Sequence, residues 1–147
     1  MSVSAQDRDA FCYFHTMTTR WRDNDVYAHV NNAVFFEYID TAVNHWLIQR
    51  AEMVLPTGDI VGLVVHAECQ YFAPLAFPEP VTAGLRVDRV GNTSVTYGVG
   101  LFSGEATSTA ALAAFTHVYV DAETHTPKRL PELLKGCLKE LTVRRRD

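Results

Sequence analysis

The stretch that decides the fold is RDNDVYAHVNNAVFFEYIDTAVNHWL, residues 22–47. Its second part is apolar at three- and four-residue intervals, which is the spacing of one helix face. The residues at these positions are Phe35, Phe36, Ile39, Ala42, Val43, Trp46 and Leu47. We therefore predict a helix over residues 31–51, about 30 Å long at 1.5 Å per residue, with Asn31 or Asn32 as its N-cap.

Strand signals occur on both sides of this helix. Five segments are rich in Val, Thr and aromatic residues: 13–21, 62–72, 81–90, 93–102 and 106–121. Gly91-Asn92 and Gly104-Glu105 predict turns between the last three strands, and Pro131 is suited to begin a short terminal helix over residues 131–141. Successive hairpins make an antiparallel sheet, so the expected class is α+β. The sheet's uncovered face and edges favour assembly into an oligomer.

Composition excludes several classes of function. The 147 residues suit one domain, residues 1–147, and a net charge of -4 does not provide a basic surface for nucleic acid. The basic run at residues 144–146 is interpreted as a solvated tail. No stretch is apolar enough to span a membrane or to serve as a signal peptide. The three cysteines are far apart, which argues against disulfides or zinc and favours a cytoplasmic protein.

The loop before the long helix holds the residues best suited to chemistry. Residues 22–32 include two aspartates, a histidine and three asparagines among their polar side chains. A helix N-terminus presents unpaired N–H groups and a partial positive charge, which can polarise a carbonyl oxygen. A carboxylate beside it adds a base or a nucleophile, so the loop contains the parts for ester-type hydrolysis.

The segment DVYAHVNN, residues 25–32, followed by FFEY, residues 35–38, resembles the 4-hydroxybenzoyl-CoA thioesterase group of the hot-dog superfamily. The D-x-x-x-H-V-N-N pattern is also similar to that of acyl-acyl-carrier-protein thioesterases. The resemblance implies a hot-dog fold, in which an antiparallel five-stranded sheet wraps around one long central helix. It also implies subunits that join edge to edge, as a homodimer or homotetramer, with active sites at the interface.

The resemblance further implies roles for individual residues. Asp25 is expected to be the catalytic carboxylate, and the backbone N–H of Asn32 is expected to polarise the thioester carbonyl. His29 is assigned either a supporting catalytic role or structural hydrogen bonding. Asn31 and Phe35 are expected to contact the substrate, although Asn31 also suits a helix cap and a residue such as Phe35 is more often part of the core.

Other residues are weaker candidates. Glu37 is the rival acid, because some branches of the superfamily carry the catalytic carboxylate on the central helix. Arg86 and Arg89, with Lys128 and Arg129, are expected near the phosphates of coenzyme A. The histidines outside the loop show no metal-ligand spacing, so we expect neither a metal nor a cofactor.

The sequence therefore predicts an acyl-CoA thioesterase, with an acyl-carrier-protein substrate and the identity of the acyl group left open. Two alternatives remain at this point. One is a hydratase or dehydratase on the same fold, and the other is a protein that binds acyl-CoA without turnover.

Overall fold

The structure of the protein is a computed structural model that describes residues 4–51 and 58–143. Its main elements are β1 (Tyr13–Met17), α1 (Asn32–Gln49), β2 (Ile60–Tyr71), β3 (Val81–Val90), β4 (Ser94–Ser103), β5 (Ala111–Asp121) and α2 (Glu132–Cys137). Short 3-10 helices lie at Arg8–Ala10, Trp21–Asp23 and Leu138–Leu141. The order of strand, long helix, four strands and terminal helix is the predicted one. The basic run at residues 144–146 lies outside the described residues.

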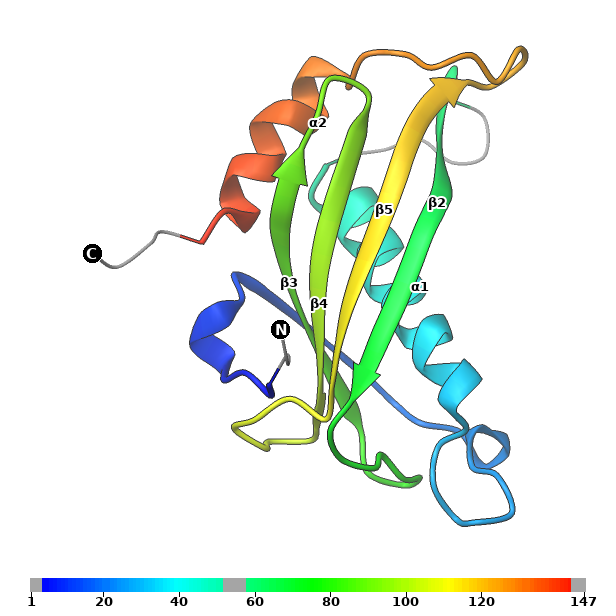
Figure 1. The fold of residues 1–147 in the computed structure, drawn as a ribbon, viewed down its shortest axis with the longest axis vertical. Helices are drawn as coiled ribbons and strands as arrows, with labels where there is room; N and C mark the ends of the chain where they lie inside the picture. The colour runs from blue at the N-terminus through cyan, green and yellow to red at the C-terminus, as the bar shows by residue number, and fades with distance from the viewer. Residues whose placement is uncertain (1–3, 52–57, 144–147) are drawn as a thin grey trace.

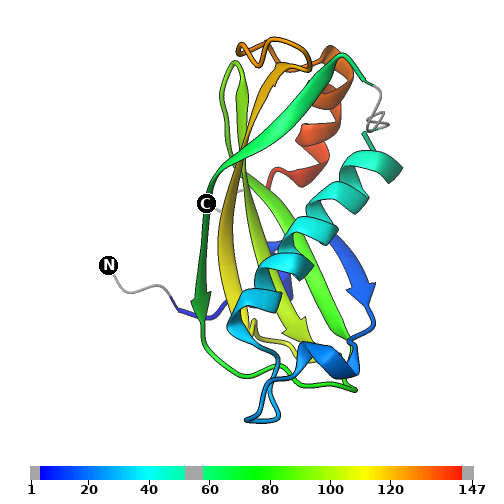
Figure 2. The same ribbon diagram turned by 90° about the vertical axis from the view of Figure 1, so that its right-hand side faces the viewer.

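The five strands form one antiparallel sheet in the order β1-β3-β4-β5-β2. Hairpins join β3 to β4 and β4 to β5, while β1 and β2 lie at the two edges. The long helix α1 crosses one face of this sheet, and the shorter α2 lies at the opposite end from the start of α1 (Figures 1 and 2). The predicted α+β class, with a sheet curved around one central helix, is confirmed.

One side chain determines where α1 begins. Asn31 has a non-helical backbone, and its Oδ1 accepts a hydrogen bond from the N–H of Ala33 at 2.9 Å. This bond pairs one of the N–H groups that the first helical turn leaves without a partner. Asn31 rather than Asn32 is therefore the N-cap, and α1 ends at Gln49, two residues earlier than predicted.

The apolar face of α1 packs against the sheet and forms the core. Its buried side chains are Phe35, Tyr38, Ile39, Ala42, Val43, Trp46 and Leu47. Fully burying an apolar side chain of the larger kind stabilises the fold by about 1.5–3 kcal/mol. The prediction differs at two positions, since Phe36 is half-buried and Tyr38 joins the core.

The first predicted strand is too long, because its end is taken up by a turn. The strand ends at Met17, and residues 21–23 form a 3-10 helix in which the N–H of Asp23 donates to the carbonyl of Arg20 at 2.9 Å. This turn places the polar loop directly under the start of α1 in Figure 2.

The last two hairpins also differ from the prediction. The β3–β4 connection has three residues, 91–93, instead of two, and the N–H of Gly91 donates to the carbonyl of Ser94 at 2.8 Å. The last strand begins at Ala111 instead of Ala106. The N–H of Ala106 donates to the carbonyl of Ser103 at 2.9 Å, so the predicted turn at Gly104-Glu105 is confirmed, and a further loop separates it from the strand.

The N-terminal segment covers part of the sheet face opposite α1. The ring of Phe11 lies directly over Gly84, where a Cβ atom would come within 2.8 Å of the ring. The guanidinium of Arg86 extends over the same ring, 5.0 Å from its centre, and donates to the side chain of Gln6 and the carbonyl of Ala10. Arg86 is therefore part of the packing of this face.

The cap of α1 is a measurable contribution to stability. We expect Asn31→Ala to lower the free energy of unfolding by about 1 kcal/mol, because the N–H of Ala33 loses its partner. Asn31→Asp should retain most of the stability, since a carboxylate accepts the same bond. Urea denaturation of both variants checks this, with the mid-helix variant Asn44→Ala as the control for loss of an asparagine side chain on α1. An Asn31→Ala loss no larger than the Asn44→Ala loss would contradict the prediction.

Candidate active site

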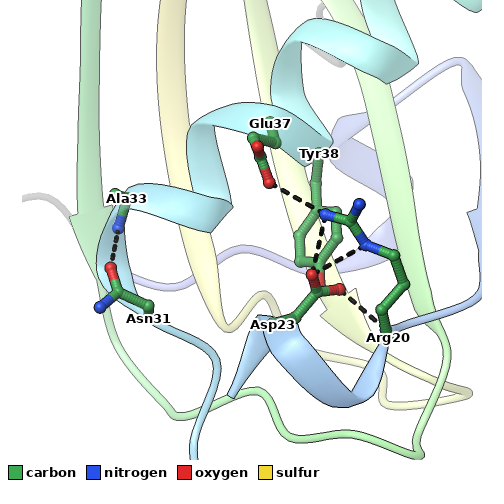
Figure 3. A network of polar contacts seen from close by, with 6 residues as sticks. All are labelled: Arg20, Asp23, Asn31, Ala33, Glu37 and Tyr38. Carbon is green, nitrogen blue, oxygen red and sulfur yellow. Dashed lines mark hydrogen bonds and ion pairs between the residues drawn. The ribbon is translucent and has the colours of Figure 1, made fainter. Parts of the chain in front are cut away.

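A buried carboxylate ties the loop to α1. Asp23 is 1% exposed, and its Oδ2 accepts hydrogen bonds from the hydroxyl of Tyr38 at 2.7 Å and from the N–H of Arg20 at 2.9 Å. Its Oδ1 faces the Arg20 guanidinium, with Nε at 3.0 Å and Nη2 at 2.9 Å. Figure 3 shows Tyr38 reaching down from α1 to this carboxylate. The charge is thereby paired, as a carboxylate removed from water must be.

These contacts determine the protonation states in the cluster. Burial by itself would raise the pKa of Asp23, but the hydrogen bonds from Tyr38 and Arg20 outweigh it and leave the pKa below its usual value. Burial and the neighbouring carboxylate raise the pKa of Tyr38 well above its usual value. Asp23 is therefore charged and Tyr38 is protonated at neutral pH, which is the arrangement that their hydrogen bond requires.

Glu37, the rival acid, is held on the solvent side of this cluster. Its side chain is 58% exposed, and its Oε2 lies 3.2 Å from Nη2 of Arg20. Arg20 thus lies between Glu37 and Asp23 (Figure 3). An ion-paired, exposed carboxylate is poorly placed to act as a base, so the geometry favours the loop over Glu37.

Asp25 lies in a tight turn that its own backbone closes. Its N–H donates to the carbonyl of His29 at 2.9 Å, and its carbonyl accepts from the N–H of Ala28 at 3.1 Å. Ala28 has a φ of 64°, the left-handed conformation that lets the chain reverse. The Oδ1 of the half-buried Asp25 accepts from the N–H of Tyr27 at 2.8 Å. Its Oδ2 takes part in no hydrogen bond with the described residues, so one oxygen is available for chemistry.

The start of α1 leaves one N–H group available. The N–H of Val30 donates to the carbonyl of Leu75 at 2.7 Å, and that of Asn31 donates to the carbonyl of Asp23 at 2.9 Å. The N–H of Ala33 is capped by Asn31. Within residues 4–51 and 58–143, the N–H of Asn32 has no hydrogen-bond partner. An uncommitted N–H at a helix start is what an oxyanion hole needs.

A hollow of about 800 Å³ opens beside Asp25. Its lining is Trp21, Arg22, Asn24, Asp25, Val26, Ala28 and Phe77. The indole of Trp21 is 79% exposed and meets the ring of Phe77 edge to face, with centroids 5.9 Å apart. Arg22 supplies a cation to the lining. The hollow thus combines apolar walls, a carboxylate and a positive charge.

Of the lining residues, only Asp25 belongs to the sites predicted from the sequence. Trp21 falls in a predicted strand and Arg22 in the predicted loop without a role, although both adjoin the polar motif. Phe77 comes from the segment before β3, and its position follows from a single long-range bond: its N–H donates to Oδ1 of Asn24 at 3.1 Å. No local signal in the sequence marks that contact.

The remaining predicted site residues around the helix start have other neighbours. The side chain of His29 is exposed and forms no hydrogen bond with the described residues, so its part in the turn is its carbonyl. Phe35 is 3% exposed and packs on the ring of Tyr71 with centroids 4.9 Å apart, which makes it a core residue. The side chain of Asn31 is occupied as the cap. Direct substrate contact by Phe35 or Asn31 stays a prediction that this geometry does not favour.

The basic residues predicted to meet coenzyme A lie elsewhere in the chain. Arg86 is bound to the N-terminal segment and to Asp88 on the far face of the sheet. Lys128 pairs with Asp121 at 3.1 Å. Arg89 stands near the end of β3, about 26 Å from the start of that strand at 3.3 Å per residue. The structure does not bring Arg86 or Arg89 to the hollow within one chain, and their contact with coenzyme A stays a prediction.

Comparison with known proteins identifies the family. The family model described as "Thioesterase superfamily" matches residues 27–110, which include the helix start and most of the sheet. The chain belongs to the thioesterase superfamily. Its sheet and central helix are the hot-dog fold of that superfamily, so the resemblance drawn from the loop motif is confirmed.

Solved structures agree over nearly the whole chain. The PA5185 protein from Pseudomonas aeruginosa strain PAO1 is 40% identical, with a TM-score of 0.92 over 95% of this chain and 97% of that one. A thioesterase from Thermus thermophilus, solved with coenzyme A and zinc, is 26% identical with a TM-score of 0.72, over 92% and 98% of the two chains. A 1,4-dihydroxy-2-naphthoyl-CoA thioesterase from Synechocystis is 19% identical with a TM-score of 0.79, over 88% and 96%, and shows the fold alone. No curated protein gives a significant match.

Two kinds of feature are absent from the described residues. No helix in residues 4–51 and 58–143 is long and apolar enough to cross a membrane. In the same part of the chain, no three His, Cys, Asp or Glu side chains are grouped so that they would hold a metal ion.

The pairing of Asp23 gives the stability of the fold a defined pH dependence. We expect Asp23→Asn to lower the free energy of unfolding at pH 7 by about 2–4 kcal/mol, because the buried network loses its negative charge and one of its two acceptor oxygens. The folded pKa lies below the usual value of 3.8. The carboxylate's contribution is therefore complete above about pH 5 and is lost as the pH falls through the folded pKa. The gap between the denaturation curves of the two proteins should narrow as the pH falls from about 7 to about 3. A constant gap across this range would contradict the assignment.

Proposed function

We propose that this thioesterase-superfamily protein hydrolyses an acyl-CoA to a carboxylic acid and free coenzyme A, with Asp25 as the catalytic carboxylate. One observation carries the proposal. Asp25 keeps an uncommitted oxygen in the loop that leads into α1, and the first N–H of that helix, on Asn32, is also uncommitted among the described residues. A negative group and a polarising donor, both unpaired, support a site for a carbonyl compound.

The proposed chemistry follows from these two groups. The thioester oxygen accepts a hydrogen bond from the N–H of Asn32, which stabilises the negative charge that develops on it in the transition state. Asp25 either takes a proton from the attacking water or attacks the carbonyl carbon itself and forms an anhydride that water then cleaves. In both routes the C–S bond breaks with its electron pair on sulfur. The thiolate leaves readily because its conjugate acid has a pKa of about 8.5.

We further propose that a second copy of the chain pairs with the edge strand β2. The edge strand β2 has exposed apolar side chains along its middle, at Leu63, Val64 and Val65. A long edge strand with such side chains pairs readily with another strand. Pairing of β2 with its counterpart in a second subunit extends the sheet, covers these residues and supports a homodimer or a homotetramer.

The carboxylate assignment is tested by two acid variants. We expect Asp25→Asn to lower kcat for acyl-CoA hydrolysis by at least roughly 100-fold, because the base or nucleophile is removed. Glu37→Gln should stay within roughly tenfold of wild type, since Glu37 only pairs with Arg20 at the surface. Release of free thiol from a panel of acyl-CoA thioesters, measured with a thiol-reactive dye, gives both values.

Other results of the same assay would lead to different conclusions. If Glu37→Gln rather than Asp25→Asn lowers kcat by at least roughly 100-fold, the catalytic acid is Glu37 on the helix. Hydration of an enoyl-CoA without thiol release would indicate a hydratase. Tight binding of acyl-CoA without any turnover would indicate a binding protein.

The hollow predicts which cation meets the coenzyme A phosphates. We expect Arg22→Gln to raise KM for an acyl-CoA roughly tenfold, equivalent to about 1.4 kcal/mol, because a charged hydrogen bond to phosphate is lost. The same variant should leave KM unchanged for the N-acetylcysteamine thioester of the same acyl group, which lacks the phosphates. Arg89→Gln is the matched control on a distant exposed arginine. If only Arg89→Gln raises KM for the CoA ester, Arg89 rather than Arg22 binds the phosphates.

A further inference from the structure

We propose that Tyr38 is a positioning residue: through its hydrogen bond to Asp23 it fixes the distance between the Asp25 carboxylate and the Asn32 N–H. The inference rests on the proposed function, because it assigns a purpose to the alignment of these two groups. Tyr38 itself contacts neither, so it acts through the loop and the helix that carry them.

The first step of the argument is the attachment of Asp23. Its side chain receives the Tyr38 hydroxyl at 2.7 Å, and its backbone carbonyl receives the N–H of Asn31 at 2.9 Å. Both bonds connect the loop to α1, one at the cap and one about two turns into the helix. Because Asp23 is 1% exposed, water has little access to replace the Tyr38 hydroxyl when it is removed.

The second step is the stiffness of the chain between Asp23 and Asp25. The intervening Asn24 accepts the N–H of Phe77 at 3.1 Å and pairs with Val30 in an isolated antiparallel bridge. Asp25 follows at once, and its N–H bonds the carbonyl of His29 at 2.9 Å. These bonds restrict the backbone of the segment, so a displacement of Asp23 also displaces Asp25.

The third step is that Tyr38 and Asn32 share one helix. Tyr38 lies six residues after Asn32 on α1, so the two move together as parts of a rigid element. The bond from Tyr38 to Asp23 is consequently a side-chain link, in addition to the bond at the cap, between the helix that carries the N–H and the loop that carries the carboxylate. A misplacement of about 1 Å between reacting groups is enough to cost roughly 100-fold in rate.

The fold supplies a matched control for this tyrosine. Tyr119 on β5 is also buried, at 0% exposed, but its hydroxyl has no hydrogen-bond partner among the described residues. Tyr38→Phe and Tyr119→Phe thus each remove one buried hydroxyl from the core of the same protein. Only the first removes a connection to the loop.

The test combines kinetics with hydrogen exchange on the full chain. In Tyr38→Phe we expect kcat for an acyl-CoA to fall roughly 10- to 100-fold while KM stays within roughly threefold of wild type. We also expect exchange of the Asp25 and Asn31 amides to accelerate at least about tenfold, because the loop opens more often. Tyr119→Phe should leave both measurements within roughly threefold of wild type.

A second variant, Arg20→Gln, tests the same proposal if Tyr38→Phe does not fold. Arg20 is half exposed and also holds Asp23, so Arg20→Gln should fold and show the same pattern at smaller amplitude, with kcat reduced and KM retained. Wild-type kcat and wild-type amide exchange in folded Tyr38→Phe would overturn the proposal. Equal losses in Tyr38→Phe and Tyr119→Phe would also overturn it, since they would reflect general loosening of the core.

The two hypotheses fail in different ways. If the wild-type protein hydrolyses no thioester, yet amide exchange in the loop accelerates in Tyr38→Phe alone, the proposed function falls and the tether from Tyr38 to the loop stands. If the wild type is active and Tyr38→Phe matches it in both measurements, the proposed function stands and the positioning role of Tyr38 falls.

Discussion

A carboxylate that is shut away from water constrains the arrangement of the whole site. Asp23 keeps its charge in an almost fully buried position, and such a charge is tolerated only when donors surround it. Those donors come from two places, Arg20 just upstream in the chain and Tyr38 on the central helix. The loop therefore has to fold back under the start of α1. The turn that presents Asp25, and the hollow beside it, follow from that one pairing.

The fold was accessible from the sequence because its signals are local. The helical spacing of apolar residues, the asparagine cap and the alternating strands each involve residues close together in the chain. The differences arise at short turns, at the end of β1 and between β3 and β4, and where a distant contact decides the structure. The strand that begins at Ala111 was extended too far back, since the preceding loop is held partly by Gln6, about a hundred residues away. The packing of Arg86 is likewise not readable from nearby residues, because its partners Gln6 and Ala10 lie near the N-terminus.

The candidate site was accessible in outline. The motif identified Asp25 and the helix start, and the superfamily match confirms the fold to which that motif belongs. The sequence does not show which loop residues act through their side chains and which act through their backbone. Side-chain chemistry drew attention to His29, whereas the structure uses its carbonyl to close the turn. The roles of Asp23 and Tyr38 depend on a contact across fifteen residues, which a linear pattern does not express.

The placement of the two tryptophans has a practical consequence. Trp46 is fully enclosed between helix and sheet, whereas Trp21 stands in water at the rim of the hollow. Intrinsic fluorescence therefore contains two separable signals, a blue-shifted emission from the interior and a quencher-accessible emission from the mouth of the site. The protein thus has a fluorescent probe at each location. Trp46 reports global unfolding, and Trp21 reports the binding of a ligand beside Asp25.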